Sequence, residues 1–320
     1  MRIFVNMLPD HINPYFWIIT LRNLLYDLKN LPIKRPSIPV ISVGNISSGG
    51  TGKTSLVRFL TNHFSQFFHV GILMRGYKRK SRGYLCVLKK GEILSSLDKA
   101  GDEAFMLSYL FQGNSRVSLS VCEKRVLGAE RMQRELNIEL LILDDAFQHR
   151  AIARDIDLVL LKKEDLSDRL LPFGLLREPL SSLKRADALI LSYQEISPFE
   201  FAFENKPVFK MYRKNFKIFN YKGEALPQEK LPSFIAFSGL GSNEQFKKIL
   251  KALSIPVKKF LSFPDHYDYR NFVLYPKESY LTTLKDFVKL PPSPNLYYLD
   301  FEVEVPGLIE FIERVLKFLP

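Results

Sequence analysis

The sequence predicts an α/β fold in which a mostly parallel sheet is flanked by helices, followed by a short β connector and a second, smaller α/β domain. Short apolar runs alternate with helical patterns between residues 40 and 193, which is typical of parallel sheets covered on both faces. Near residue 206 the pattern changes to aromatic residues that alternate with basic ones. A chain of 320 residues is long enough for two domains, so we place them at 1–206 and 231–320, with the connector at 207–230.

Composition excludes several classes of protein. With 46% hydrophobic and 25% charged residues, the chain can bury a core and is not a disordered segment. Its cysteines, Cys86 and Cys122, are far apart, so we expect neither a disulfide framework nor a zinc site, and we expect a reducing compartment. The formal net charge of +12 favours an anionic partner, and nucleic acid, anionic lipid and phosphorylated metabolites all fit that description.

The first predicted element is an amphipathic helix that starts at Pro14. Its apolar positions recur at helical spacing and are Phe16, Trp17, Ile19, Leu21, Leu24, Leu25 and Leu28. Asp10, His11 and Arg22 are among the polar residues that interrupt any apolar run long enough to span a bilayer. Periodicity leaves two interpretations open: the helix packs on the core of its own domain, or it lies in a membrane interface.

The remaining elements follow in order. Apolar runs predict strands at 40–46, 69–74, 84–88, 116–121, 138–145, 156–161 and 187–193. Helical periodicity predicts helices at 54–64, 101–111 and 124–136. Short strands or a hairpin are expected within 206–227, then a strand within 232–241, a helix at 243–253 and a strand at 295–305. Ligands of parallel sheets bind at the carboxyl ends of the strands, so functional residues are expected there.

A glycine-rich loop between the first of these strands and the helix behind it indicates a phosphate site. Residues 47–54 match G-x-x-x-x-G-K-[ST] at every defined position except the first, where Ser47 replaces glycine. Lys53 would reach the β- and γ-phosphates of ATP, and the Thr54 hydroxyl would bind Mg²⁺. The backbone cradle would comprise Ser47, Ser48, Gly49, Gly50, Thr51, Gly52, Lys53 and Thr54. A glycine-rich turn with an incidental lysine is the weaker alternative, and the loop favours a P-loop NTPase-like sheet.

Two carboxylates at the end of a later strand favour the same site. Asp144 and Asp145 end the apolar run at 138–145, where they would bind Mg²⁺ or its water shell beside the loop. Alternatively, paired aspartates after a strand cap the next helix. A guanine-specific switch is not favoured, because Asn205-Lys206 is followed by Pro207. Since Ser48, and not lysine, precedes the Gly-Gly pair, a dimerising ATPase is not favoured either, and a transfer enzyme is.

Further segments, taken together in this order, resemble the tetraacyldisaccharide 4'-kinase family, the lipid A 4'-kinases, over nearly the whole chain. The matching segments are VGNISSGGTGKT, RGY, GDE, DDAFQH, LLPFGLLREP with RAD, FSGLG, FPDHY and TTLKD. A non-glycine residue at the position of Ser47 is part of that resemblance. The sequence departs from the family pattern at Ala146 and Lys78, where glycine is expected, and at Leu284, which interrupts an expected TTEKD.

The resemblance implies transfer of the ATP γ-phosphoryl group to the 4'-hydroxyl of an acylated glucosamine disaccharide 1-phosphate, giving lipid IVA. On that basis Asp102 is expected to be the catalytic base, and His266, from the second domain, to orient it. Lys53 is the third catalytic residue, and Glu103 and Asp145 are expected in the metal shell with Thr54 and Asp144. The expected substrate and phosphate contacts are Arg75, Tyr77, Arg125, His149 and Arg177.

A lipid substrate changes the interpretation of the N-terminal helix, which is now expected to dock on anionic lipid at the cytoplasmic face of the inner membrane. The protein is then peripheral. The sequence does not determine its oligomeric state, for which a monomer is favoured. Nucleic-acid binding is not expected, because the basic run at 78–82 lies in no recognisable module. A kinase or ligase for a soluble metabolite would explain the loop but not the N-terminal helix. The alternative that is not a transfer enzyme is a nucleotide-dependent scaffold or switch at the membrane, which would hydrolyse ATP slowly with no acceptor.

Overall fold

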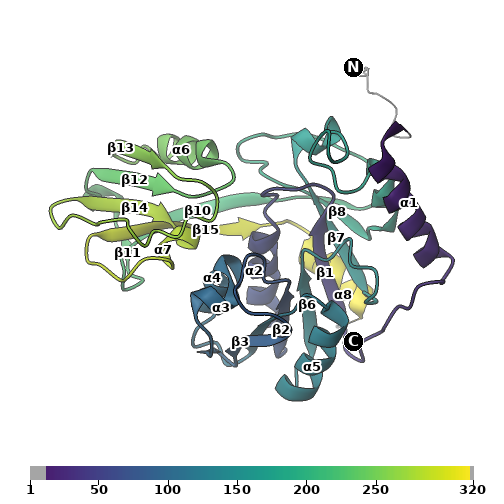
Figure 1. The fold of residues 1–320 in the computed structure, drawn as a ribbon. Coiled ribbons are helices and arrows are strands. Elements are labelled where there is room, and N and C mark those ends of the chain that lie inside the picture. The colour runs from purple at the N-terminus through teal and green to yellow at the C-terminus, as the bar shows by residue number, and fades with distance from the viewer. Residues whose placement is uncertain (1–11, 318–320) are drawn as a thin grey trace.

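The computed structural model describes residues 12–317, which form two lobes, each built around one sheet (Figure 1). The nine-stranded sheet of the large lobe has the order β4-β3-β5-β2-β6-β1-β7-β8-β9. Its strands are β1 (Val40–Asn45), β2 (Val70–Met74), β3 (Leu85–Lys89), β4 (Glu92–Ile93), β5 (Val117–Val121), β6 (Leu140–Asp144), β7 (Ile156–Leu161), β8 (Ala188–Leu191) and β9 (Val208–Lys210). In this spatial order, each pair of neighbouring strands from β5 to β9 is parallel. Strand β3 runs antiparallel to both of its neighbours, β5 and β4.

Helices cover both faces of the large sheet because its strands are apolar on both sides. Ile41 and Val43 pack with helices α2 (Lys53–Phe64) and α4 (Asp102–Leu110), whereas Val40 packs with α5 (Arg125–Leu136) on the opposite face. This division follows from the strand geometry, in which successive side chains point to opposite faces. Shorter helices of this lobe are α3 (Leu97–Ala100), η2 (Lys163–Leu166) and η3 (Leu180–Arg185).

The small lobe contains a six-stranded sheet in the order β11-β10-β15-β14-β12-β13. Its strands are β10 (Tyr212–Phe219), β11 (Ala225–Leu226), β12 (Phe234–Ser238), β13 (Val257–Ser262), β14 (Ser279–Thr283) and β15 (Leu296–Glu304). Its helices are η4 (Gln228–Lys230), α6 (Asn243–Ala252) and α7 (Leu284–Phe287). One apolar cluster, which includes Phe237 and Phe287, covers the α7 side, and a second, which includes Phe246 and Leu250, covers the α6 side.

The two long antiparallel strands β10 and β15 run from the small lobe to the large one (Figure 1). After β15 the chain re-enters the large lobe as helix α8 (Leu308–Leu316), whose Leu308 and Ile312 share a core with α2. The division at 231–320 stays a prediction, and α8, which lies within that range, packs with the core of the large lobe. The expected connector is divided as well: β9 belongs to the large sheet, and β10 and β11 belong to the small one.

Helix α1 (Pro14–Asp27) lies at the edge of the large lobe (Figure 1). It begins where predicted, with Pro14 in the first turn and the Asn13 side chain accepting a hydrogen bond from the Tyr15 backbone N–H. Tyr15 and Phe16 pack on the core, whereas large apolar side chains further along the helix are exposed. Among the helices that the structure describes, none combines the length and apolarity required to cross a bilayer.

Candidate functional site

The glycine-rich loop leaves the centre of the large sheet between β1 and α2. Gly49 and Gly52 have φ values of +99° and +86°, which L-residues with side chains rarely adopt. A side chain at Gly52 would also meet Met211, whose Cε lies 2.7 Å from the position of an added Cβ. Ser47, by contrast, has no positive φ and forms a β-bridge with Leu176, which explains why glycine is not required at the first motif position.

The loop is held in place by hydrogen bonds from neighbouring elements. Asn45 Nδ2 donates to Thr51 Oγ1 over 3.0 Å, and Ser192 Oγ donates to the Thr51 carbonyl over 2.8 Å. Tyr193 Oη donates to the Gly50 carbonyl over 3.0 Å. These bonds fix the backbone before any ligand is present, as a preorganised phosphate cradle requires.

Asp144 ends β6, the strand that pairs with β1, and its Cα is in register with that of Val43. Its side chain is buried, and neither of its carboxylate oxygens has a hydrogen-bond partner in the described part of the chain. Burial, together with the charge of Glu103, raises the pKa of Asp144 to about 7, although the charge of Lys53 opposes the shift. Two bare oxygens beside a phosphate loop fit a hard cation such as Mg²⁺.

The described residues provide no cluster of three or more metal-ligating side chains. This is compatible with Mg²⁺, which usually takes one or two protein carboxylates and completes its octahedron with water and phosphate oxygens. Asp144 is the best-placed carboxylate, and Glu103 is an exposed one close enough to affect the Asp144 pKa. Thr54 lies in the first turn of α2, as its expected role requires.

Asp145, the next residue, has a different environment. Its carboxylate accepts two hydrogen bonds of 3.0 Å from Arg177 Nη1 and lies 3.5 Å from Lys53 Nζ. Burial opposes ionisation, but the charges of Lys53 and Arg177 outweigh it and lower the pKa of Asp145. In this arrangement Asp145 pairs with the loop lysine, so its expected place in the metal shell stays a prediction. Arg177 also reaches Ser48 Oγ over 3.4 Å and thereby contacts the loop directly.

The expected acid–histidine pair is in contact across the two lobes. Asp102 occupies the first turn of α4 in the large lobe, and its Oδ2 lies 2.9 Å from His266 Nδ1 in the small lobe. Burial opposes ionisation of Asp102, but hydrogen bonds from His266 and Lys289 outweigh it and lower its pKa to about 2. The position at a helix N-terminus also favours the ionised form. Asp102 is therefore a charged carboxylate at neutral pH.

The expected substrate contacts lie in contrasting environments. Arg75 and Tyr77 are exposed, and the Tyr77 ring centroid is 5.7 Å from that of His266. Arg125 is 2% exposed and donates to the backbone carbonyls of Cys122 and Asp144 over 2.8 and 3.2 Å. In this structure Arg125 therefore supports the backbone at the end of β6, beside Asp144. Burial, with the charges of Arg125 and Arg75, lowers the pKa of His149 to about 4.

Two charged residues that motif analysis did not assign also lie at this site. Lys289 Nζ is 2.9 Å from Asp102 Oδ2, the oxygen that His266 contacts. Glu178, next to Arg177, is buried and receives hydrogen bonds from Arg185 and from Arg22 and Asn23 of α1. Glu178 was visible in the sequence as the charged residue after Arg177 in the LLPFGLLREP segment. No sequence pattern, however, showed that residues of α1 bind it.

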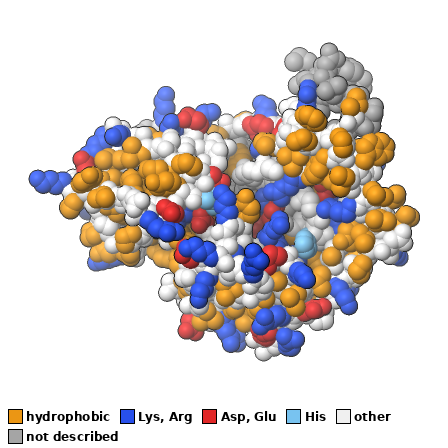
Figure 2. Space-filling view, viewed as in Figure 1, with side chains coloured by type: hydrophobic (Ala, Val, Ile, Leu, Met, Phe, Trp, Pro, Cys, Tyr) orange, Lys and Arg blue, Asp and Glu red, His pale blue; other side chains and the backbone are white. Residues whose placement is uncertain are grey.

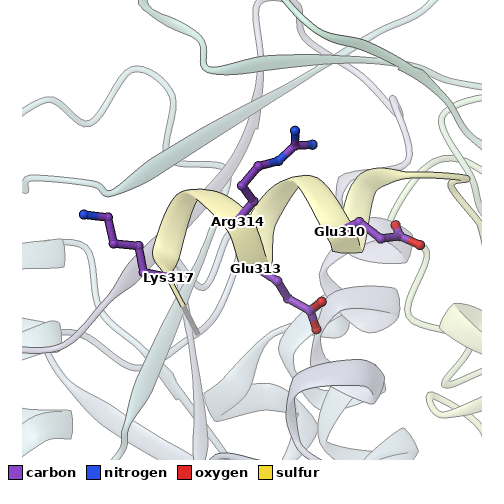
Figure 3. Close-up of a pocket in the computed structure, with 4 residues that line it drawn as sticks. All are labelled: Glu310, Glu313, Arg314 and Lys317. Carbon is purple, nitrogen blue, oxygen red and sulfur yellow. The ribbon is translucent and has the colours of Figure 1, made fainter. Parts of the chain in front are cut away.

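Basic and hydrophobic side chains gather in different regions of the molecular surface. Figure 2 shows Lys and Arg side chains gathered in the hollow between the lobes and hydrophobic side chains over α1. A separate shallow pocket lies on α8 and is lined by Glu310, Glu313, Arg314 and Lys317 (Figure 3). None of the motif residues lines that pocket.

Comparisons with known proteins identify the family. The profile of tetraacyldisaccharide-1-P 4'-kinase, LpxK, matches residues 13–318. The chain belongs to this family. It is 50% identical to the tetraacyldisaccharide 4'-kinase of Aquifex aeolicus, with 93% of this chain and 95% of that protein covered. The enzyme of the same name from Halothermothrix orenii is 32% identical, with 95% and 90% covered.

A solved structure of the family supports the fold. The crystal structure of LpxK from Aquifex aeolicus in complex with ATP matches with a TM-score of 0.87 and 47% identity. The match covers 95% of each chain. The predicted fold class, an α/β fold with mostly parallel sheets flanked by helices, is confirmed. This tetraacyldisaccharide 4'-kinase family member therefore has the architecture of an ATP-binding relative along nearly its whole length.

Proposed function

We propose that this chain is an ATP-dependent kinase that phosphorylates the 4'-hydroxyl of tetraacyldisaccharide 1-phosphate and so produces lipid IVA in lipid A biosynthesis. Family membership over residues 13–318 supports the activity. The observation that carries it at the level of geometry is the contact between Asp102 of the large lobe and His266 of the small lobe, on the same molecule as an intact phosphate loop. An acceptor between the lobes would meet the carboxylate and the loop together.

The donor half of the reaction requires neutralisation of charge on the transferring group. In our proposal Lys53 faces the β- and γ-phosphates from the start of α2, while the loop amides hold the α- and β-phosphates. Mg²⁺, when bound by Thr54, Asp144 and Glu103, would neutralise charge that develops on the phosphate oxygens. Binding of ATP would bring phosphate oxygens to Lys53, which now pairs with Asp145 at 3.5 Å.

The acceptor half requires an oriented hydroxyl group. Asp102 is ionised and accepts the hydroxyl proton, while His266 holds the carboxylate in place. A carboxylate with a pKa of about 2 is a weak base, but phosphoryl transfer passes through a loose transition state in which positioning and charge dominate. Arg75, Tyr77, His149 and Arg177 are proposed to contact the substrate, with Arg125 holding the backbone behind them.

Helix α1 is proposed to bring the enzyme to its lipid substrate at the cytoplasmic face of the inner membrane. Its exposed apolar side chains are Trp17 (57%), Ile18 (67%), Leu21 (58%) and Leu24 (47%), followed by Leu28 (59%). An exposed apolar row on a helix is favourable in a lipid interface, and the net charge of +12 adds attraction to anionic headgroups. Bonds from α1 to Glu178 place this surface beside Arg177 and the phosphate loop.

The test is a transfer assay with purified protein, labelled ATP, Mg²⁺ and tetraacyldisaccharide 1-phosphate in mixed micelles. A labelled bisphosphorylated lipid is the expected product, and it should be absent with Lys53→Ala protein. Label released only as inorganic phosphate, at the same rate with and without lipid, would indicate a switch and contradict the proposal. Transfer to a soluble sugar but not to the lipid would indicate a metabolite kinase.

A further inference from the structure

Lys289, just after α7, is a buried cation at the contact between the lobes. Its side chain is 2% exposed, and its Nζ lies 2.9 Å from Asp102 Oδ2 and 3.1 Å from Asp286 Oδ1. The same ammonium group donates to the backbone carbonyl of Tyr267 over 3.2 Å. All three of its protons therefore have an acceptor, and the direction of the side chain is fixed.

Asp286 anchors this lysine to the small lobe. Its side chain is completely buried, and its Oδ2 accepts hydrogen bonds from the Gly239 backbone N–H over 2.8 Å and from Thr283 Oγ1 over 3.1 Å. Oδ1 is left for Lys289. Thr283 and Asp286 belong to the TTLKD segment, so that segment sets the direction of Lys289 even though Leu284 departs from the family pattern.

The two contacts with Asp102 go to one oxygen. His266 Nδ1 and Lys289 Nζ both lie 2.9 Å from Oδ2, whereas Oδ1 takes no hydrogen bond or ion pair from the residues described in the structure. The Asp102 side chain is 20% exposed, so Oδ1 is the oxygen left to meet an acceptor. His266 is held in turn by Asp265, whose carboxylate lies 3.5 Å from Nε2 and 3.1 Å from Lys285 Nζ.

We propose that Lys289 is a positioning residue for the phosphoryl transfer: together with His266 it holds Oδ2 of Asp102, so that Oδ1 is directed at the acceptor hydroxyl. Both groups that hold the carboxylate come from the small lobe, and the carboxylate comes from the large lobe. Asp102 is thus aimed only when the lobes meet as they do here. This inference rests on the proposed role of Asp102. It also gives the TTLKD segment a role, which is to anchor Lys289 through Asp286.

The first test is Lys289→Met, which keeps the length of the side chain and removes its charge. Because misplacement of a reacting group by about 1 Å can reduce turnover about a hundredfold, we expect a fall in kcat of that order. The KM values for ATP and for the lipid should stay within about twofold of wild type, since neither the loop nor α1 is touched. Lys258→Met is the matched control: Lys258 forms a surface ion pair with Glu278 in the same lobe, and its loss should leave kcat unchanged.

A second variant separates positioning from stability. Lys289→Met leaves the buried Asp286 carboxylate without its counter-charge, which is destabilising. The double variant Lys289→Met with Asp286→Asn removes both charges together. We expect the double variant to regain much of the melting temperature but not the kcat. Recovery of kcat to within twofold of wild type would mean that Lys289 only stabilises the fold, and would overturn the proposal.

Asp102→Asn, assayed in parallel, separates the role of Lys289 from the proposed role of Asp102 as the base. An inactive Asp102→Asn protein together with wild-type kcat in Lys289→Met would reject the role of Lys289 and leave the proposed function intact. Substantial transfer by Asp102→Asn would instead reject Asp102 as the base, and with it the reason for holding that carboxylate.

Discussion

Asp144 and Asp145 are adjacent in sequence but have opposite electrostatic environments. Asp144 has two bare oxygens and a raised pKa, whereas Asp145 is paired with Lys53 and Arg177 and has a lowered one. The difference has a conformational cause: Asp144 is the last residue of β6, while Asp145 has a φ of +53°, so its side chain turns toward the loop. One aspartate is thus suited to a metal and the other to the lysine.

Lys53→Ala tests the donor half of the site. Removing the cation that we propose to face the transferring phosphoryl group should reduce kcat/KM by about a hundred- to a thousandfold. The fold should survive, because Asp145 keeps its contact with Arg177 at 3.0 Å. Turnover is measured with labelled ATP and lipid, and the melting temperature serves as the control. Near-normal turnover in a folded variant would reject the phosphate-loop assignment.

His149 gives a prediction about pH and stability. Its pKa is lowered to about 4 by burial and by nearby arginines, while in the unfolded chain it is about 6.5. Between these values the unfolded state binds more protons, so stability is complete above about pH 6.5 and falls as the pH decreases toward 4. His149→Gln should remove about 1 kcal/mol of this loss, since the side chain is only partly buried and solvent screens its interactions. Urea unfolding at pH 5 and pH 7 measures it; identical pH dependence in both proteins would contradict the assignment.

At the scale of elements, sequence patterns predicted the centre of the large lobe well. The expected runs at 40–46, 54–64 and 138–145 correspond to β1, α2 and β6, and they place the loop and Asp144 side by side. Local signals were sufficient there, because a fully buried strand and a glycine-rich turn each leave a distinct pattern. The pairing of Asp102 with His266 came from the family resemblance, since the two residues are 164 positions apart.

Other elements were not predicted, for physical reasons. Strand β13 carries exposed lysines and is only half-buried, so it lacks the apolar run of a core strand. The amphipathic pattern of α8 was available in the sequence, but its packing on the first domain depends on the long return through β15. Lys289 was missed because the segment that holds it departs from the family pattern at Leu284, and no local signal shows what a buried lysine pairs with.

Helix α1 provides a prediction at the same scale. Leu21→Glu with Leu24→Glu places two charges in the exposed apolar row and should reduce co-sedimentation with anionic vesicles by about tenfold or more. Neither leucine is buried, so the melting temperature should change little. Leu127→Glu is the matched control, since Leu127 is an exposed leucine (42%) on α5, away from this surface. Equal vesicle binding by all three proteins would place the attachment elsewhere.

At the scale of the whole molecule, the site exists only because two lobes meet. Strands β10 and β15 join the lobes, and Arg58 of α2 fixes one of them by donating to both carboxylate oxygens of Asp300 over 2.7 and 2.8 Å. The phosphate-loop helix is therefore tied to the strand that leads into the small lobe. The small lobe, with His266 on it, is therefore connected to the loop helix by a direct contact as well as by the chain.

A double-mutant cycle tests whether the lobes act as one catalytic unit. Asp102→Asn and His266→Ala should each reduce kcat by about a hundredfold or more. Either change removes the charge-assisted contact of 2.9 Å between Asp102 Oδ2 and His266 Nδ1. If the two residues act together, the double variant should lose little more than the worse single variant. ATP affinity, measured by equilibrium binding, should remain near wild type in all three, since neither side chain belongs to the phosphate cradle. Losses that multiply would mean that the residues act independently, and a loss of ATP affinity in Asp102→Asn alone would move that carboxylate from the acceptor to the metal.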